Sequence, residues 1–266
     1  MTKTISFIGT GKMATALIGC IYDKNISKKI IASDKQNENL VKIKKQFSQI
    51  KTTNDNKEAV KNSDIVFLCV KPQDIDDVLD EIKDTVKNQL VVSIAAGIKL
   101  KHLESKLKGR RVIRVIPNIN CLVGEMAAGF SAGKHATKED INEVSKILNS
   151  AGNAFLLKEE LLDAVTGLSG SGPAFFAYFI KAMESAGIKN GLPKEIAFQL
   201  AAQTCIGTGR LLIEKKITPE ELIEMVASKK GTTEAGLKIL DKSNANKILK
   251  DAINAAVKRS RELGKK

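Results

Sequence analysis

A glycine-rich segment near the N-terminus, Gly9-Thr10-Gly11-Lys12-Met13-Ala14, has the residue types and spacing of a dinucleotide-binding turn. In such a turn Gly9 allows the tight bend, Gly11 lets backbone approach a diphosphate, and Ala14 allows close helix–strand packing. The segment directly follows the apolar run 5–8 and opens a helical pattern, where exposed N–H groups bind anions. A tight turn without a ligand uses the same glycines, but the surrounding strand and helix favour dinucleotide binding.

Three residues at the end of the next strand-like run bear on the choice of dinucleotide. Asp34 stands 20 residues after Ala14, where an acid accepts the ribose 2′-hydroxyl of NAD. Ser33 and Lys35 have the hydroxyl and the charge to hold the 2′-phosphate of NADP instead. A helix N-cap is an equally simple role for Asp34, so these residues do not decide between NAD and NADP.

Two further strand-like runs end in residues suited to the nicotinamide half of a cofactor. Val70-Lys71-Pro72-Gln73 ends the third run, and Ser93-Ile94-Ala95-Ala96-Gly97 ends the fourth. Ligands of open α/β sheets collect at the carboxyl ends of the strands. Small residues such as Ala95, Ala96 and Gly97 would let a flat ring lie on backbone. An ordinary structural turn explains either segment as well.

A second candidate anion site lies late in the chain, at Gly231-Thr232-Thr233 before a short helix over 234–242. Backbone N–H groups and two hydroxyls at a helix start suit one carboxylate, and Ser228 would add a third hydroxyl. A threonine N-cap without a ligand is the simpler explanation, and the pattern alone favours it.

Other chemistries find no suitable residues. The run 169–173 (Ser-Gly-Ser-Gly-Pro) lacks a preceding strand and a histidine partner, so we interpret it as a flexible, close-packed hinge rather than a nucleophile loop. His102 and His135 stand far apart without nearby ligands, and the four cysteines form no Cys-x-x-Cys pair. These patterns argue against a metal site, a disulfide framework and a hydrolase.

The charge balance is strongly basic, at +13, but 37 of the 43 basic residues are lysines spread among acids. Arginine, which reads bases in bidentate fashion, is scarce, and aromatic residues for stacking are few. We therefore expect a lysine-rich solvated surface that attracts anionic ligands, and no nucleic-acid partner. The sequence shows no membrane span and no signal peptide, so a cytoplasmic location and no membrane partner are expected.

The elements that position these residues form two patterns. In the first half, β-branched apolar runs alternate with helical stretches such as 37–46, which predicts a doubly wound parallel α/β sheet. The predicted strands are 5–8, 30–32, 65–70, 90–94, 112–116 and 153–157. A helix capped by Thr137 is expected before the last strand. Strand-like runs then end, so we predict a dinucleotide-binding domain over 1–158 and an all-helical domain over 159–266.

The helical half carries clear boundary signals. Pro173 and Pro193 are expected near helix starts, and Thr218-Pro219-Glu220-Glu221 predicts a capping box. A last amphipathic helix is expected over 246–263. Small residues within 201–209 would permit close packing of helices or subunits.

Several stretches resemble landmarks of the pyrroline-5-carboxylate reductase family, in the family's order over nearly the whole chain. The most specific are 163–174 (Asp-Ala-Val-Thr-Gly-Leu-Ser-Gly-Ser-Gly-Pro-Ala) and 231–237 (Gly-Thr-Thr-Glu-Ala-Gly-Leu). The others are 7–14, 70–73, 93–97 and 114–118 (Arg-Val-Ile-Pro-Asn).

The resemblance implies a Rossmann domain followed by a helical dimerisation domain, often in a ring of dimers. It implies that NADPH, or alternatively NADH, delivers hydride to the C=N carbon of 1-pyrroline-5-carboxylate, giving L-proline in the last step of proline synthesis. The residue matching Thr233 hydrogen-bonds the imine nitrogen, which makes Thr233 the implied catalytic residue. The matches of Ser228, Thr232 and Thr233 hold the substrate carboxylate. Asn56 matches an asparagine near the adenosine ribose.

Three places depart from the family pattern. Lys229 and Lys230 replace the usual Pro-Gly before Gly231, which would alter the backbone of the loop or add charge near the carboxylate. Residues 119–121 are Ile-Asn-Cys in place of Thr-Pro-Ala, and Met126 follows Gly124-Glu125 without a further glycine. The competing functions, in order, are a reductase of a related imine or hydroxyacid, a dinucleotide-binding regulator that has lost catalysis, and a nucleic-acid binder.

Overall fold

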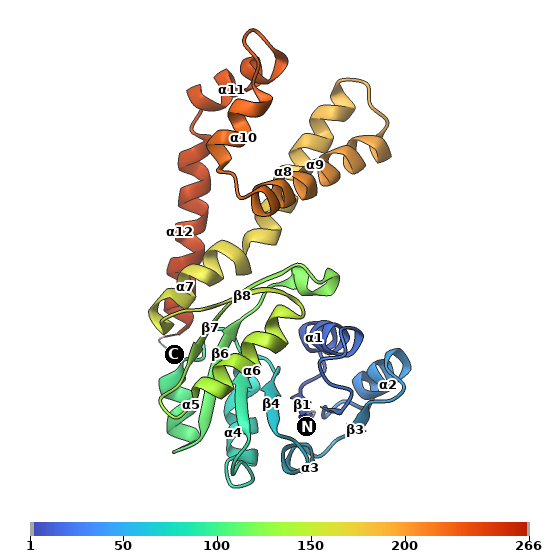
Figure 1. Ribbon diagram of the computed structural model, residues 1–266, viewed down its shortest axis with the longest axis vertical. Helices are drawn as coiled ribbons and strands as arrows, with labels where there is room; N and C mark the ends of the chain where they lie inside the picture. The colour runs from blue at the N-terminus through green and yellow to red at the C-terminus, as the bar shows by residue number, and fades with distance from the viewer. Residues whose placement is uncertain (1–2, 265–266) are drawn as a thin grey trace. The chain divides into compact units, whose positions relative to one another are not determined.

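The computed structural model describes residues 3–264, and the chain divides into two compact units. The sheet unit contains Met1–Ser171 and Ala255–Lys266, and the helical unit contains Gly172–Asn254 (Figure 1). Residues 159–171 and the end of the last helix therefore belong to the sheet unit.

Two contacts explain why the residues after 158 stay with the sheet unit. Leu162 and Val165 pack on the backbone of Gly129, where an added Cβ would lie 3.2 Å and 2.8 Å from them. The Ser260 hydroxyl donates a 2.6 Å hydrogen bond to Asp163, and Ser260 is buried.

The sheet unit is built on one eight-stranded sheet with the strand order β3-β2-β1-β4-β5-β6-β7-β8. All neighbouring strands run parallel except β6 and β7, which pair antiparallel. The strands are β1 (Ile5–Ile8), β2 (Ile30–Ser33), β3 (Lys51–Thr53), β4 (Ile65–Leu68), β5 (Leu90–Ser93), β6 (Arg111–Ile116), β7 (Met126–Ala132) and β8 (Gly152–Leu156). The predicted doubly wound sheet is confirmed, and β3 and β7 are strands that the sequence pattern did not predict.

Helices cover both faces of this sheet. α1 (Lys12–Asp23), α2 (Asn37–Gln46) and α6 (Lys138–Asn149) bury apolar side chains against one face. α3 (Asn56–Lys61), α4 (Ile75–Ile82) and α5 (Leu100–Lys106) do so on the other. This arrangement explains why β1, β2, β4 and β5 are buried along their whole length, and why their residues are apolar apart from the small Ser6, Ser33 and Ser93.

Helix starts follow the predicted capping residues. Thr137 is the N-cap of α6 and Thr218 is the N-cap of α10, and each forms a reciprocal capping box with the acid three residues on. These two boxes satisfy N–H groups that a helix start otherwise leaves without partners.

The serine-glycine run is helical rather than flexible, so that part of the prediction was wrong. A short helix α7 (Leu162–Val165) continues into a π-helical turn, Thr166–Gly170, closed by a 2.9 Å bond from the Ser171 N–H to the Thr166 carbonyl. The Asn118 side-chain amide donates to the Ser169 carbonyl at 3.1 Å. This contact holds the run against the segment after β6, which a local sequence pattern does not reveal.

The helical unit consists of α8 (Gly172–Lys189), α9 (Lys194–Lys215), α10 (Pro219–Val226), α11 (Thr232–Lys242) and the first part of α12 (Ala245–Leu263). α8 and α9 pack together, with a Cβ at Gly187 reaching to 3.1 Å from Ala197. Many large apolar side chains of this unit are exposed, among them Tyr178, Phe198 and Ile213. By length and composition alone, α9 is the one described helix apolar enough to cross a membrane.

Candidate functional site

The sheet order brings the predicted cofactor segments to one edge. β2, β1, β4 and β5 are consecutive neighbours in the sheet, so the segments that follow them begin side by side. The Gly9 N–H donates to the Ser33 carbonyl at 2.8 Å, and the Cys69 N–H donates to the Ile8 carbonyl at 2.8 Å. The segments that follow these strands therefore lie together at the carboxyl edge of the sheet, where open α/β sheets bind their ligands.

The two glycines of the glycine-rich turn differ in whether the fold requires a glycine at that position. Gly9 has φ of 87°, and an added Cβ would lie 3.0 Å from the Cys69 carbonyl group and from a Val70 methyl group. Gly11 has φ of −69°, is exposed, and an added Cβ would meet nothing within 4 Å. Gly9 is therefore required by the fold, whereas the space beside Gly11 is open to a ligand.

The start of α1 has the chemistry of an anion site. Gly11 is the N-cap and has no side chain to cap the helix, and the first turn contains no acidic residue. The N–H groups of Lys12 and Met13 therefore open the helix without a carbonyl partner inside it, and Lys12 is exposed. A diphosphate fits the positive end of the helix dipole at this position.

Asp34 is buried, and all its described contacts point into the protein. One carboxylate oxygen, Oδ2, accepts from the Thr10 N–H at 2.8 Å, the Thr10 hydroxyl at 2.9 Å and the Asn39 amide at 3.2 Å. The other, Oδ1, accepts from the Gln36 N–H at 2.9 Å. Burial on its own would raise the pKa of Asp34, but the bonds from Gln36, Thr10 and Asn39 outweigh it and hold that pKa below its ordinary value.

The other residues predicted near the adenosine ribose differ in how deeply they are buried and in the contacts they make. The Ser33 hydroxyl is buried and donates to Asn56 Oδ1 at 2.7 Å, and the Asn56 amide donates to Glu81 at 2.8 Å. Lys35 is 79% exposed, and its ammonium lies 3.7 Å from Asp74. Glu81 was not among the predicted residues, because nothing in the sequence places α4 beside Asn56.

The segments after β4 and β5 contribute exposed backbone. Val70 is half-buried and Lys71 and Pro72 are exposed, with Pro72 opening a single 3-10 turn. Ala95 is buried and Ala96 is exposed. Gly97 has φ of 78°, and Leu263 at the end of α12 lies 3.4 Å from the position of an added Cβ. The loop 95–97 is thus supported from one side by the last helix.

The predicted substrate turn lies in the helical unit. Gly231 is the N-cap of α11, and no side chain caps that helix, so the simpler explanation of a threonine N-cap is wrong. A Cβ at Gly231 would collide with the Ser228 hydroxyl, so the two residues are in close contact. Thr233 is half-buried and Thr232 exposed. The turn therefore brings the Ser228 hydroxyl close to the residue that opens α11, and Thr232 and Thr233 are the first two residues of that helix.

The lysines next to this turn keep an unusual backbone. Lys230 has φ of 59°, in the left-handed region where glycine is favoured, and its N–H donates to Glu234. The ion pair with Lys238, and then this N–H bond, lower the pKa of Glu234. The sequence predicted that a lysine here would alter the backbone of the loop or add charge near the carboxylate. Lys230 adopts a left-handed backbone conformation that glycine also adopts readily.

A buried ion pair was missed by the sequence analysis. Arg114 in β6 is buried and donates to Glu159 at 3.0 Å, and the same Glu159 oxygen accepts the Leu100 N–H at 2.7 Å. Among the described residues the Arg114 Nε has no hydrogen-bond partner. The pair joins the sheet to the start of α5, and only an arginine within an apolar run hinted at it.

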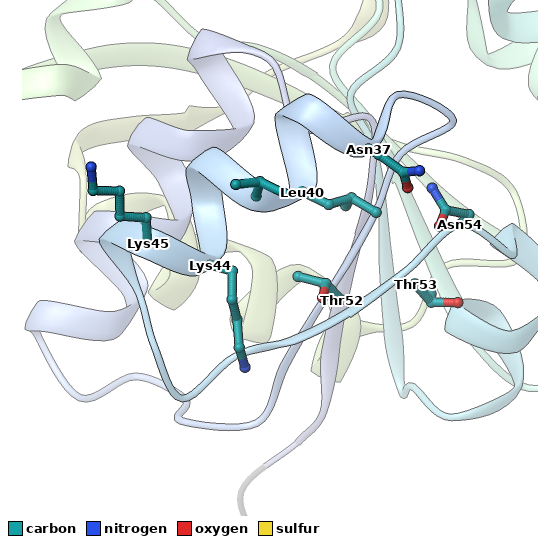
Figure 2. A pocket seen from close by; sticks show the side chains of 8 residues that line it. Asn37, Leu40, Lys44, Lys45, Thr52, Thr53 and Asn54 are labelled. Atoms are coloured by element: carbon teal, nitrogen blue, oxygen red, sulfur yellow. The ribbon is translucent and has the colours of Figure 1, made fainter.

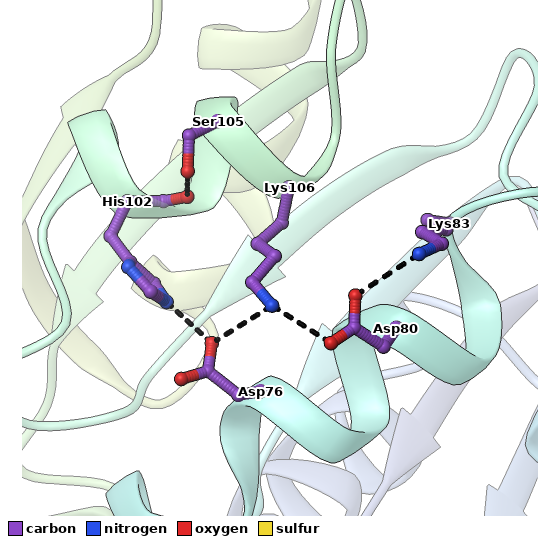
Figure 3. Close-up of polar contacts among 6 residues, drawn as sticks. All are labelled: Asp76, Asp80, Lys83, His102, Ser105 and Lys106. Carbon is purple, nitrogen blue, oxygen red and sulfur yellow. Dashed lines mark hydrogen bonds and ion pairs between the residues drawn. The ribbon is translucent and has the colours of Figure 1, made fainter.

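Two surface grooves are lined by residues other than the predicted ones, although Asn54 in the lining of the first donates to the Asp34 carbonyl at 2.8 Å. One of about 570 Å³ runs along α2 and β3, lined by Leu40, Lys44, Thr53 and others (Figure 2). A second, of about 440 Å³, adjoins the charged cluster of α4 and α5 (Figure 3). There His102 contacts Asp76 at 2.6 Å and Lys106 bridges Asp76 and Asp80. Neither groove includes a predicted site residue in its lining.

Metal and thiol chemistry have little support in this structure. Within residues 3–264, no three His, Cys, Asp or Glu side chains are grouped to hold a metal ion. The four cysteines are free thiols, and burial together with neighbouring Cys20 raises the pKa of Cys121 to about 12. The arrangement suits binding of an anionic dinucleotide at one helix start and of a small anion at another.

Known proteins match both halves of the chain. Residues 159–263 match the family model described as pyrroline-5-carboxylate reductase dimerisation, and residues 4–97 match that of coenzyme F420-dependent NADP oxidoreductases. Over 99% of each sequence, the chain is 40% identical to a pyrroline-5-carboxylate reductase from Methanosarcina acetivorans. It is 37% identical to pyrroline-5-carboxylate reductase 2 from Bacillus subtilis, over 98% of this chain and 95% of that protein.

Solved structures agree with these matches. A pyrroline-5-carboxylate reductase from Coxiella burnetii superposes with a TM-score of 0.95 over 100% of both chains, at 32% identity. A pyrroline carboxylate reductase from Plasmodium falciparum, with NADP bound, superposes with a TM-score of 0.87 over 98% of both chains, at 29% identity.

Proposed function

Since this chain belongs to the pyrroline-5-carboxylate reductase family, we infer that it reduces the C=N bond of 1-pyrroline-5-carboxylate to L-proline with NAD(P)H. The observation that carries this conclusion is the match over essentially the full length of the reductase from M. acetivorans. The enzyme is an oxidoreductase of proline biosynthesis.

We propose that the carboxyl edge of the sheet holds the cofactor. The open space beside Gly11 and the N–H groups of Lys12 and Met13 support a diphosphate there. The remaining cofactor contacts proposed at this edge come from Gly9, Thr10, Ser33, Lys35, Asn56, Val70, Lys71, Pro72, Ala95, Ala96 and Gly97. When bound, the cofactor supplies hydride, and the residues of this edge orient it and exclude water. Lys35, exposed and cationic, favours the 2′-phosphate of NADPH over NADH.

We propose that the turn in the helical unit holds the substrate carboxylate through Ser228, Gly231, Thr232 and Thr233. Support comes from the helix start, which no side chain caps, and from the contact of Gly231 with the Ser228 hydroxyl. Thr233 would hydrogen-bond the imine nitrogen and orient the C=N bond. A protonated imine is already electrophilic, so a hydroxyl is sufficient and no strong general acid is needed.

The experiment follows NADPH and NADH consumption with 1-pyrroline-5-carboxylate and with its six-membered homologue. Reduction of the five-membered imine is expected, and reduction of neither imine would refute the proposal. Preference for the six-membered homologue would favour the related-imine alternative.

Thr233→Ala should lower kcat at least tenfold, a loss of about 1.4 kcal/mol of transition-state stabilisation, with little change in NADPH affinity. Thr233→Ser retains the hydroxyl and serves as the matched control. Unchanged turnover in Thr233→Ala would remove Thr233 from the mechanism.

The chain self-associates through its dimerisation region. We propose that the exposed apolar side chains of α8 and α9 form this interface, and that dimers further assemble into a ring. The apolar character of α9 is accounted for by such a subunit interface, without a membrane. We also propose a cytoplasmic location, no nucleic-acid partner, and residues 159–266 as the dimerisation and substrate-binding domain, of which Gly172–Asn254 form the compact helical unit.

A further inference from the structure

Asp34 joins two segments of the cofactor edge that are far apart in the sequence. Its Oδ2 accepts two bonds from Thr10, one from the backbone N–H at 2.8 Å and one from the hydroxyl at 2.9 Å. The acid therefore holds the residue between Gly9 and Gly11, 24 positions earlier in the chain.

Most of the carboxylate's acceptor capacity is used inside the protein. Each carboxylate oxygen offers about two lone-pair sites: Oδ2 accepts three bonds, two from Thr10 and one from Asn39, and Oδ1 accepts one from Gln36. Asp34 is only 8% exposed. A ribose 2′-hydroxyl therefore finds only the remaining site on Oδ1, on a side chain with little exposed surface.

The Thr10 peptide is held from both sides. Its N–H and hydroxyl donate to Asp34, and its carbonyl accepts from the Thr15 hydroxyl at 3.3 Å. The preceding Gly9 stands at φ of 87°, a conformation that glycine adopts without steric cost. Fixing Thr10 in this way also fixes Gly11 and the first N–H groups of α1.

We propose that Asp34 is a positioning residue that holds the Gly9–Gly11 turn ready for the diphosphate, and that it does not recognise the ribose. The inference rests on the proposed function only in that this turn binds NADPH or NADH. It departs from the first expectation for Asp34, a ligand of the 2′-hydroxyl. Discrimination between the two cofactors then falls to other residues of the edge, with exposed Lys35 the first candidate.

The two roles of Asp34 predict different binding patterns. A positioning residue acts on the diphosphate, which both cofactors share, so its loss weakens NADPH and NADH alike. A ligand of the 2′-hydroxyl acts on NADH alone, because NADPH carries a phosphate at that position.

The experiment measures dissociation constants of NADPH and NADH by fluorescence titration, for the wild type and for Asp34→Asn, Thr10→Val and the double variant. Asp34→Asn should weaken both cofactors about tenfold, the loss expected for charge-assisted bonds. The ratio of the two constants should stay within about twofold of wild type. Thr10→Val should weaken both cofactors, and the double variant should be no weaker than Asp34→Asn, because the two residues act as one unit.

Two control comparisons show that the binding assay can distinguish the two roles of Asp34. Lys35→Ala should weaken NADPH alone and shows that the assay registers a change in the ratio. If Asp34→Asn does not fold, the comparison of Thr10→Val with Thr10→Ser carries the test, because serine retains the hydroxyl and should bind both cofactors as wild type does.

Two results would overturn the proposal: weakening confined to NADH, or unchanged affinity for both cofactors in Asp34→Asn and Thr10→Val. Because the readout is cofactor binding, an enzyme that binds NADPH but reduces no cyclic imine would refute the proposed function and leave this test intact.

Discussion

Replacing Gly11 by alanine should separate cofactor binding from folding. Gly11 has φ of −69° and ψ of −177°, which alanine adopts without strain, and the added Cβ meets no protein atom within 4 Å. An N-cap alanine costs about 0.5–1 kcal/mol relative to glycine, and the less flexible unfolded chain returns about 0.4–1 kcal/mol. The free energy of unfolding should therefore stay within about 0.5 kcal/mol of wild type.

The same methyl group stands in the open space that we assign to the diphosphate. Hydrogen bonds to phosphate weaken steeply once the donor and acceptor separate beyond about 3.2 Å, and one methyl group is large enough to force that separation. A loss of at least about 1.4 kcal/mol, or tenfold in NADPH affinity, is expected.

Gly9→Ala provides the contrasting variant. Its φ of 87° costs an alanine about 1–2 kcal/mol, and a Cβ 3.0 Å from the Cys69 carbonyl group adds about 1–3 kcal/mol of overpacking. Denaturant unfolding and NADPH titration of both variants form the assay. A Gly11→Ala protein that binds NADPH as tightly as wild type would refute the assignment of the diphosphate to this turn.

Two further predictions concern stability. Lys230→Gly should raise the free energy of unfolding by about 0.5–1 kcal/mol, because Lys230 has φ of 59° and glycine adopts this angle without strain. Lys229→Gly is the control, and equal stability of Lys230→Gly and wild type in denaturant would contradict the prediction. The lowered pKa of Asp34 makes its contribution to stability fully present above its ordinary pKa of about 3.9 and lost as pH falls through the lower folded value. The stability difference between wild type and Asp34→Asn should therefore shrink between pH 7 and pH 3, and a constant difference in denaturant unfolding would speak against this coupling.

Buried strands and helix caps could be predicted from the sequence, because their causes are local. β4 and β5 lie in the middle of the sheet and are buried on both faces, so every position is apolar or small. Thr218 stands three residues before Glu221, the spacing of a capping box, and Thr137 precedes a helical pattern as an N-cap does.

The missed strands depend on pairing partners that a local pattern does not contain. β3 is a short edge strand of lysine and threonines, formed by its register with β2. β7 contains small residues without alternation, and its antiparallel pairing with β6 departs from the parallel rule of the preceding strands. Both strands form because they pair with a neighbouring strand, and their own sequences are compatible with several kinds of secondary structure.

The candidate cofactor edge could be predicted as a set of strand ends, but the direction of each side chain could not. An acid at the end of the second strand either faces a ribose or turns inward, and the choice depends on which donors lie behind it. Here Thr10 and Asn39 supply those donors, and only the pairing of β1 with β2 brings Thr10 to Asp34. A hydroxyl residue between the two glycines, together with an asparagine five positions after the acid, therefore forms a three-part pattern that favours an inward carboxylate. An apolar residue in place of Thr10 would remove the hydroxyl donor and leave Oδ2 with two bonds instead of three, so the inward orientation of Asp34 would be held less strongly.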